Sequence, residues 1–210
     1  MIVLPTTYMG SVEWYKRYLA NPQEVQIEVM ESFPKQTYRN RCTISQAIGR
    51  KGDEAIGKEP LTLSVPVKRA DSKQLTRDVE ISYQQRWQHQ HWIALVSAYK
   101  RTPYFDYYAP YFESFYTQRF ESLVEYNTAL TKTLMRLLGI EGELHLSESY
   151  IDAQEGDCDL RVKNRESLFD SPRYFQLFSD RFPFEPNLSV VDLLFAEGPS
   201  AIEFLRRCRL

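Results

Sequence analysis

The sequence predicts an α/β fold: a single domain over residues 1–210, with a mixed β-sheet that starts with a βαβ unit and is covered by several helices. Three observations predict it. Residues 2–29 follow a strand–helix–strand pattern, and residues 83–138 carry apolar side chains at helical spacing. With 210 residues, of which 43% are hydrophobic and 26% charged, the chain also has the size and composition of one globular domain.

The N-terminal βαβ unit begins with the apolar run Ile2-Val3-Leu4, which is typical of a buried strand. Ser11 is placed to cap the helix that follows, and residues 25–29 alternate apolar and polar side chains as a second strand. The two strands should lie parallel with a right-handed crossover, so the loop after the first strand lies at the carboxyl end of the sheet, where α/β folds usually hold ligands. Tyr8, in this loop, is therefore a candidate substrate-binding residue.

A basic stretch follows at residues 35–41. Residues 37–44 have the β-branched and aromatic content of a strand, and alternation would put Arg39 and Arg41 on one face, about 7 Å apart. Two guanidiniums at that spacing suit a ligand with two anionic groups, because each can fork onto a carboxylate or phosphate. The alternative is a solvated basic strand that pairs with surface carboxylates. The predicted substrate-binding residues of this stretch are Lys35, Tyr38, Arg39, Asn40 and Arg41.

A long-looped hairpin is expected next. Residues 45–60 are rich in glycine and charge and are predicted to be a flexible connection, while residues 61–67 alternate as the partner strand. The connection contains no glycine-rich phosphate-binding motif. Residues 79–82 and 143–146 are predicted to form short further strands.

Helices are predicted over residues 83–101, 110–117 and 119–138, the first starting with a capping box of Ser82 and Gln85. His91 lies on the apolar stripe of the first helix between two tryptophans, where burial disfavours the charged form. It is the candidate catalytic residue, a base that accepts a proton; the alternative is a structural histidine packed in the core.

Towards the C-terminus, Ser189 and Asp192 are predicted to form a capping box at the start of a short buried helix that ends at Gly198. A last helix is expected after Ser200. Glu28 and residues 150–171 are expected at the surface, because neither lies in an apolar pattern.

Composition narrows the class of function. The net charge of -2 argues against general nucleic-acid binding, and no apolar run is long enough for a membrane span. Without a signal sequence the protein is expected to be cytoplasmic. The three cysteines indicate neither a disulfide framework nor a zinc site, so no metal is predicted and the cofactor is unknown. The 14 Tyr and 12 Phe line a sugar or nucleotide pocket in one interpretation and build the core in the other.

Several motifs together resemble the WbqC-like protein family, in order along nearly the whole chain. They are Lys35-Gln36-Thr37-Tyr38-Arg39-Asn40-Arg41, Leu63-Ser64-Val65-Pro66-Val67, Trp87 with His91-Trp92 and Ala98-Tyr99, Pro103-Tyr104-Phe105, and Pro186-Asn187-Leu188-Ser189-Val190-Val191-Asp192-Leu193-Leu194-Phe195 with Gly198-Pro199. The chain departs from relatives in the first loop, where Gly10 and Ser11 stand in place of paired prolines.

The resemblance implies a role in surface-polysaccharide synthesis of the O-antigen type. The role proposed for the family's namesake is the transfer of an amino acid, glycine, onto an amino sugar. On that basis the expected enzyme is an aminoacyl transferase whose small-molecule partners are a nucleotide sugar and an aminoacyl donor. The alternative is a non-catalytic partner or assembly factor in the same synthesis. Neither interpretation specifies an oligomeric state.

Overall fold

In the computed structural model, described for residues 1–51, 54–68, 73–161, 169–177, 179–180 and 182–210, a small parallel sheet forms at the N-terminus. Strand β1 (Ile2–Pro5) lies between β2 (Val25–Glu28) and β5 (Cys158–Asp159), and is parallel to both. Helix α1 (Val12–Ala20) connects β1 to β2, and the Ser11 hydroxyl caps it by accepting from the Trp14 amide. The predicted βαβ unit is therefore confirmed.

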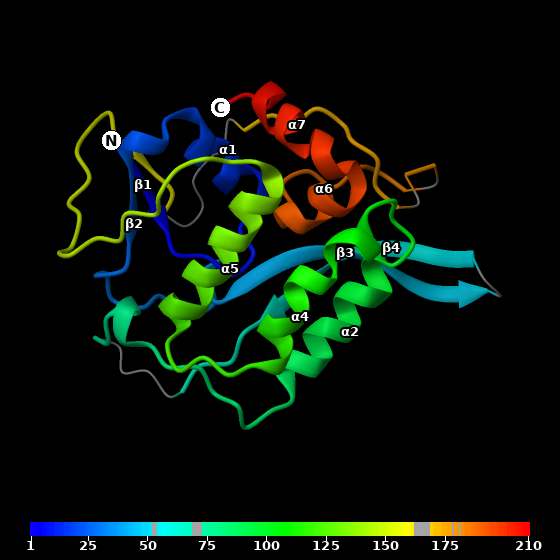
Figure 1. The fold of residues 1–210 in the computed structure, drawn as a ribbon, viewed down its shortest axis with the longest axis horizontal. Coiled ribbons are helices and arrows are strands. Elements are labelled where there is room, and N and C mark those ends of the chain that lie inside the picture. Colours follow the sequence, from blue (N-terminus) through cyan, green and yellow to red (C-terminus); the bar gives the residue numbers. More distant parts are fainter. Residues whose placement is uncertain (52–53, 69–72, 162–168, 178, 181) are drawn as a thin grey trace.

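A second, antiparallel sheet is a hairpin of β3 (Arg41–Lys51) and β4 (Glu54–Ser64), whose register runs from Arg41↔Ser64 to Lys51↔Glu54. Its distal part extends beyond the helices (Figure 1). The flexible connection predicted for residues 45–60 is thus wrong, because the ladder continues outward from its buried half. The α/β class is confirmed, with the strands divided between this hairpin and the parallel sheet.

The basic stretch before β3 is a turn rather than a strand up to Asn40. The Asn40 amide donates to the Thr37 carbonyl at 3.2 Å, and Gln36 has a left-handed φ of 62°. Hydrogen bonds of the turn thus take the place of ladder bonds before Arg41. The expected alternation of Arg39 and Arg41 on one strand face is wrong for this reason.

Helices pack beside the parallel sheet and the proximal half of the hairpin (Figure 1). The α-helices after α1 are α2 (Trp87–Tyr99), α3 (Phe105–Tyr108), α4 (Pro110–Thr117), α5 (Leu123–Leu138), α6 (Val190–Glu197) and α7 (Ala201–Arg207), and the 3-10 turns are η1 (Pro22–Glu24), η2 (Thr76–Asp78) and η3 (Gly198–Ser200). Helix α2 starts at Trp87 without a side-chain cap, so the predicted Ser82–Gln85 box is wrong. Residues 79–82 and 143–146 make isolated bridges instead of the predicted strands.

Helix α5 shows how sequence signals fix one element. The Ser122 hydroxyl accepts from the Glu125 amide at its start, and Gly139, with φ 70°, ends it as predicted. Its apolar seam is fully buried, including Leu123, Leu130 and Leu134. Each such leucine contributes about 1.5–3 kcal/mol through burial. No helix within the described ranges has the length and apolarity needed to cross a membrane.

Candidate functional site

The loop at the carboxyl end of β1 is the most unusual segment near the predicted site. Residues 6–10 are all buried, although loops normally run over the surface. Met9 has a φ of 45°, a strained conformation for a residue other than glycine. Gly10 is tightly enclosed, because an added Cβ would lie 2.8 Å from Thr7 Cγ2. Strain and burial of this kind are typical of functional loops.

Tyr8 links this loop to α2. Its hydroxyl lies 2.9 Å from Nδ1 of His91 and 3.0 Å from the hydroxyl of Tyr116 on α4. Burial lowers the pKa of His91 to about 4, although the Ser64 carbonyl acts to raise it. Burial also raises the pKa of Tyr8 well above its ordinary value. At neutral pH the imidazole is therefore neutral and accepts at Nδ1, while the Tyr8 hydroxyl donates.

The basic turn docks against the same loop. The Tyr38 carbonyl accepts hydrogen bonds from the Tyr8 amide and the Thr7 hydroxyl, at 3.1 and 3.2 Å. Nε of Arg39 donates to Glu31 at 2.6 Å, and the Arg39 guanidinium is only 3% exposed. The alternative prediction, a solvated basic strand that pairs with surface carboxylates, is therefore wrong for Arg39.

The structure gives the predicted substrate-binding residues of the basic stretch three different levels of exposure. The side chains of Lys35 and Tyr38 are exposed, with Tyr38 60% exposed. Arg39 and Asn40 are buried, and Asn40 Nδ2 donates to the Val65 carbonyl at 2.9 Å. Arg41 is half-buried and pairs in register with Ser64, the residue whose carbonyl acts on His91.

Asn127 is a site residue that sequence reasoning missed. Its Nδ2 donates to the Arg39 carbonyl at 2.7 Å and to the Thr6 hydroxyl at 3.2 Å, so it joins the basic turn to the β1 loop. It is fully buried on α5, in the apolar seam between Leu123 and Leu130. The signal in the sequence that could have identified Asn127 is an amide side chain at a position that the helical pattern places in the apolar seam.

Several buried polar atoms here lack a hydrogen-bond partner among the described residues. They are Arg39 Nη2, Asn40 Oδ1, Arg41 Nε, Trp87 Nε1, Tyr126 Oη and Asn127 Oδ1. Leaving one such group unpaired costs about 1–3 kcal/mol, so a cluster of them needs an explanation such as a ligand or ordered water. We name Tyr8, Arg39, Asn40, Arg41, His91 and Asn127 the carboxyl-end site.

A neighbouring charged cluster is satisfied internally. Glu28 is fully buried and accepts hydrogen bonds from Arg161 Nη1, Ser147 Oγ and the amides of Met30 and Ile151. Its predicted exposure is wrong, because residues 150–161 fold over it. Burial alone would raise the pKa of Asp159, but hydrogen bonds from Arg161 bring it below its ordinary value, and the Arg39 charge acts in the same direction.

The C-terminal motif packs on the site instead of capping α6 with side chains. Ser189 makes no side-chain cap, and Asp192 accepts from the Tyr174 hydroxyl at 2.5 Å and from Gln176 Nε2 at 3.0 Å. The predicted capping box is therefore wrong. The motif's backbone contacts the β1 loop directly, since the Val190 amide donates to the Gly10 carbonyl at 2.9 Å.

A metal centre has no support in the described ranges, which contain no group of three or more His, Cys, Asp or Glu residues arranged to hold an ion. Three of the motifs singled out in the sequence contact the loop after β1, through the Tyr38 carbonyl, the His91 imidazole and the Val190 amide.

Comparison with known proteins gives one match. The model of the WbqC-like protein family matches residues 23–168, well over half of the chain. Neither the curated proteins nor the solved structures returned a match. The family match spans the basic turn, the hairpin, α2 and α5, which supply most of the carboxyl-end site. The chain therefore belongs to the WbqC-like protein family.

Proposed function

We propose that the protein is an aminoacyl transferase that delivers a glycine-type aminoacyl group to the amine of a nucleotide-linked amino sugar, in surface-polysaccharide synthesis of the O-antigen type. Membership of the WbqC-like family implies a role related to polysaccharide biosynthesis. The observation that carries the finer proposal is the pairing of a neutral, buried His91 with Tyr8. The Tyr8 amide also donates to the Tyr38 carbonyl, and Arg39 and Arg41, which follow in the chain, each have a buried nitrogen without a partner in the described part of the chain.

In this reaction the amine nitrogen attacks the acyl carbon of an activated donor, the amide bond forms, and the bond from the acyl carbon to its leaving group breaks. The amine must lose a proton as it attacks. The Tyr8 oxygen takes that proton while its own proton passes to His91 Nδ1, 2.9 Å away. Arg39 Nη2 and Arg41 Nε supply donors for the phosphates of the sugar nucleotide.

The first experiment finds a ligand. A thermal-shift screen with nucleotide sugars, ATP and amino acids detects binding, because a ligand at a hundredfold its Kd stabilises the fold by about 2.7 kcal/mol. Arg41→Gln should remove the stabilisation by a nucleotide sugar while leaving the melting temperature of the free protein nearly unchanged.

The second experiment tests the base. Single-turnover transfer by His91→Gln should fall by about 10²–10⁴-fold, the usual contribution of a general base. His89→Gln is the matched control, because His89 is exposed on the same helix. If His91→Gln folds normally and reacts within about threefold of the parent, far outside that range, His91 is a packing residue.

A non-catalytic partner role is the second candidate, and the exposed Lys35 and Tyr38 side chains favour it as a docking face. In that case Lys35→Glu with Tyr38→Ala would abolish association with a polysaccharide-synthesis protein. The same double variant would leave the ligand-induced thermal shifts unchanged if the protein is an enzyme as well.

A further inference from the structure

A surface on the far side of α5 from the carboxyl-end site combines exposed tyrosines with unpaired cations. Tyr107 and Tyr111 lie four residues apart in α3 and α4, and are 67% and 43% exposed. Ala109 between them is helical, so both side chains share one face. Lys132 and Arg136 are exposed on α5, one turn apart, about 6 Å along the axis. We call these four residues the tyrosine–arginine surface.

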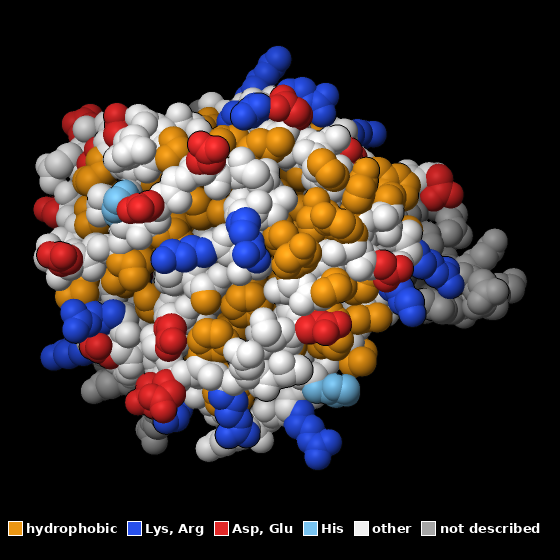
Figure 2. Space-filling view, in the orientation of Figure 1, with side chains coloured by type: hydrophobic (Ala, Val, Ile, Leu, Met, Phe, Trp, Pro, Cys, Tyr) orange, Lys and Arg blue, Asp and Glu red, His pale blue; other side chains and the backbone are white. Residues whose placement is uncertain are grey.

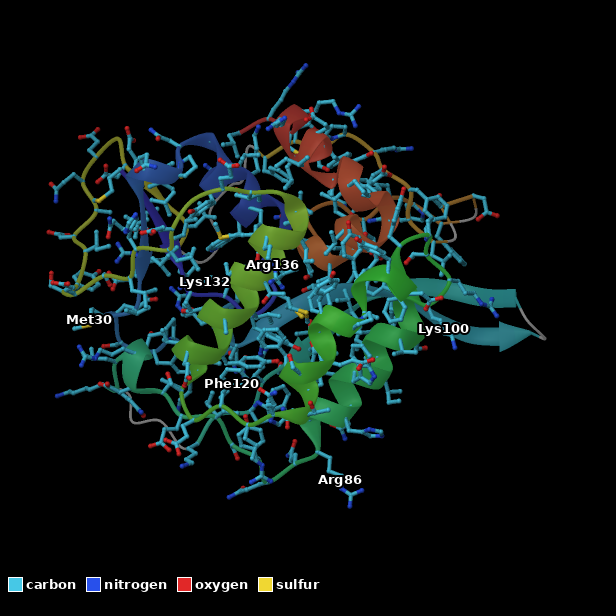
Figure 3. The ribbon with its side chains drawn as sticks, in the orientation of Figure 1. Met30, Arg86, Lys100, Phe120, Lys132 and Arg136 are labelled. Atoms are coloured by element: carbon cyan, nitrogen blue, oxygen red, sulfur yellow. The ribbon has the colours of Figure 1, made fainter. Side chains whose placement is uncertain are left out.

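Arg136 contacts a tyrosine of this surface directly. The guanidinium carbon of Arg136 lies 5.7 Å from the centre of the Tyr111 ring. Burial raises the pKa of Tyr108, and the neighbouring hydroxyls of Tyr107, Tyr104 and Tyr111 add to that rise, so the phenol groups are gathered together. Figure 2 shows orange side chains grouped over α3 and α4 beside two cations near the centre of the view, and Figure 3 places Lys132 and Arg136 on α5.

The described residues place no carboxylate in an ion pair with the cations of this surface. Neither Lys132 nor Arg136 forms an ion pair in the ranges that the structure describes. Two like charges at i and i+4 repel one another on a helix, and an anionic ligand would relieve that repulsion. The acids of α3 and α4 are Asp106 and Glu113, which are exposed and form no ion pair with Lys132 or Arg136 in the described part of the chain.

We propose that the tyrosine–arginine surface binds an acidic carbohydrate chain. Exposed tyrosine rings offer flat apolar faces for the C–H faces of sugar rings, and their hydroxyls offer hydrogen bonds to sugar hydroxyls. Lys132 and Arg136 attract the carboxylate or phosphate groups. An anionic membrane is a poorer fit, because lipid-binding patches generally carry about four to eight cations and this one carries two. The assignment of a sugar as the ligand rests on the proposed role in polysaccharide synthesis. The existence of a binding surface rests only on the exposure and charge of these four residues.

Binding is measured by isothermal titration calorimetry with an oligogalacturonate as the acidic probe. Malto-oligosaccharide of equal length tests the sugar without charge, and polyphosphate tests charge without sugar. The wild-type protein should bind the oligogalacturonate more tightly than either, and added salt should weaken this binding. Binding of phosphatidylglycerol vesicles with no oligogalacturonate binding would overturn the assignment in favour of a membrane.

Variants then assign the binding to this surface. Tyr111→Ala and Arg136→Gln should each weaken oligogalacturonate binding by about two- to fivefold, and together by about tenfold. Arg86→Gln, an exposed cation at the start of α2 that Figure 3 shows far from Arg136, is the matched control and should bind normally. Equal losses in the control, or equal binding of polyphosphate, would contradict the proposal.

This test is independent of the transferase proposal. The surface lies outside the carboxyl-end site, so Tyr111→Ala should leave single-turnover transfer on a small substrate unchanged. Conversely, His91→Gln should leave oligogalacturonate binding unchanged. If the wild-type protein does not bind oligogalacturonate but His91→Gln still slows transfer, only the second site is refuted. If the wild-type protein binds oligogalacturonate but His91→Gln does not slow transfer, only the transferase mechanism is refuted.

Discussion

At the scale of single residues, the Tyr8–His91 pair shows what one sequence reveals about a site and what it hides. Helical periodicity placed His91 on the buried stripe of α2, and the structure confirms this, with His91 5% exposed. Periodicity contains no information on which residue meets the imidazole. Tyr8 lies 83 positions earlier, and only the packing of α2 against the β1 loop joins them.

His91 should make stability depend on pH. Its pKa falls from about 6.5 in the unfolded chain to about 4 in the folded one, because burial disfavours the cation. Between these pH values the folded state binds fewer protons than the unfolded chain. The contribution of His91 to the free energy of unfolding is therefore fully present above pH 6.5 and is lost as pH falls towards 4. The loss approaches about 3 kcal/mol.

The measurement is the free energy of unfolding of the parent and of His91→Gln by urea titration at several pH values. The difference between the two should shrink or change sign as pH falls from 6.5 to 4. Carboxylates titrate in both proteins and cancel in the comparison. Parallel pH curves would contradict the depressed pKa.

At the scale of elements, local sequence signals predicted helix ranges better than strand ends, although both predicted capping boxes were wrong. The predicted range of α4 and the Gly139 end of α5 agree with the structure, because each depends on neighbours in sequence. The strand predicted from residue 37 failed because the turn's bonds to Tyr8 and Thr7 are long-range. The hairpin itself was predicted, but its extension through residues 45–51 and 54–60 was not, since glycine content does not show that a partner strand continues alongside.

The β1 loop provides a test of close packing. Gly10→Ala should destabilise the protein by about 1–3 kcal/mol, because the new Cβ would lie 2.8 Å from Thr7 Cγ2. Thr7→Ser removes that methyl but keeps the hydroxyl that donates to Tyr38. The double variant should therefore recover part of the loss in a thermal or urea melt. Additive effects of the two changes would show that the contact is not the cause.

The start of α6 gives a prediction opposite to the one that the capping-box pattern suggests. Ser189 Oγ is buried without a hydrogen-bond partner in the described structure, so Ser189→Ala removes an unpaired hydroxyl. The free energy of unfolding should change by less than about 0.5 kcal/mol, or increase. Ser122→Ala is the matched control, because Ser122 does cap α5 and its loss should cost about 1 kcal/mol. A similar cost at both positions would restore the capping interpretation.

At the scale of the whole molecule, the α/β class followed from the N-terminal pattern, whereas the way in which the later chain returns to the sheet did not. Strand β5 pairs with β1 through only two residues, Cys158 and Asp159. The polar residues around it have no periodicity, so the sequence predicted a surface connection. What holds this segment is a buried ion pair between Arg161 and Glu28, whose side chains are 8% and 0% exposed.

Breaking that pair should loosen the parallel sheet more than its short β5 ladder suggests. Arg161→Met leaves the Glu28 carboxylate buried without its cation, which typically costs about 3–5 kcal/mol. Adding Glu28→Gln removes the stranded charge. Its one acceptor oxygen can still accept from the Ile151 amide, and its new N–H group can donate to the Ser147 hydroxyl, so the double variant should be more stable than Arg161→Met alone. Arg206→Met is the control, because Arg206 pairs with Glu203 in the open, at 60% and 63% exposure, and should cost at most about 1 kcal/mol. Urea unfolding gives the free energies, and hydrogen exchange of the β1 and β5 amides shows where the protein opens. If Arg161→Met costs no more than Arg206→Met, the segment is held by other contacts and the ion pair is not its anchor.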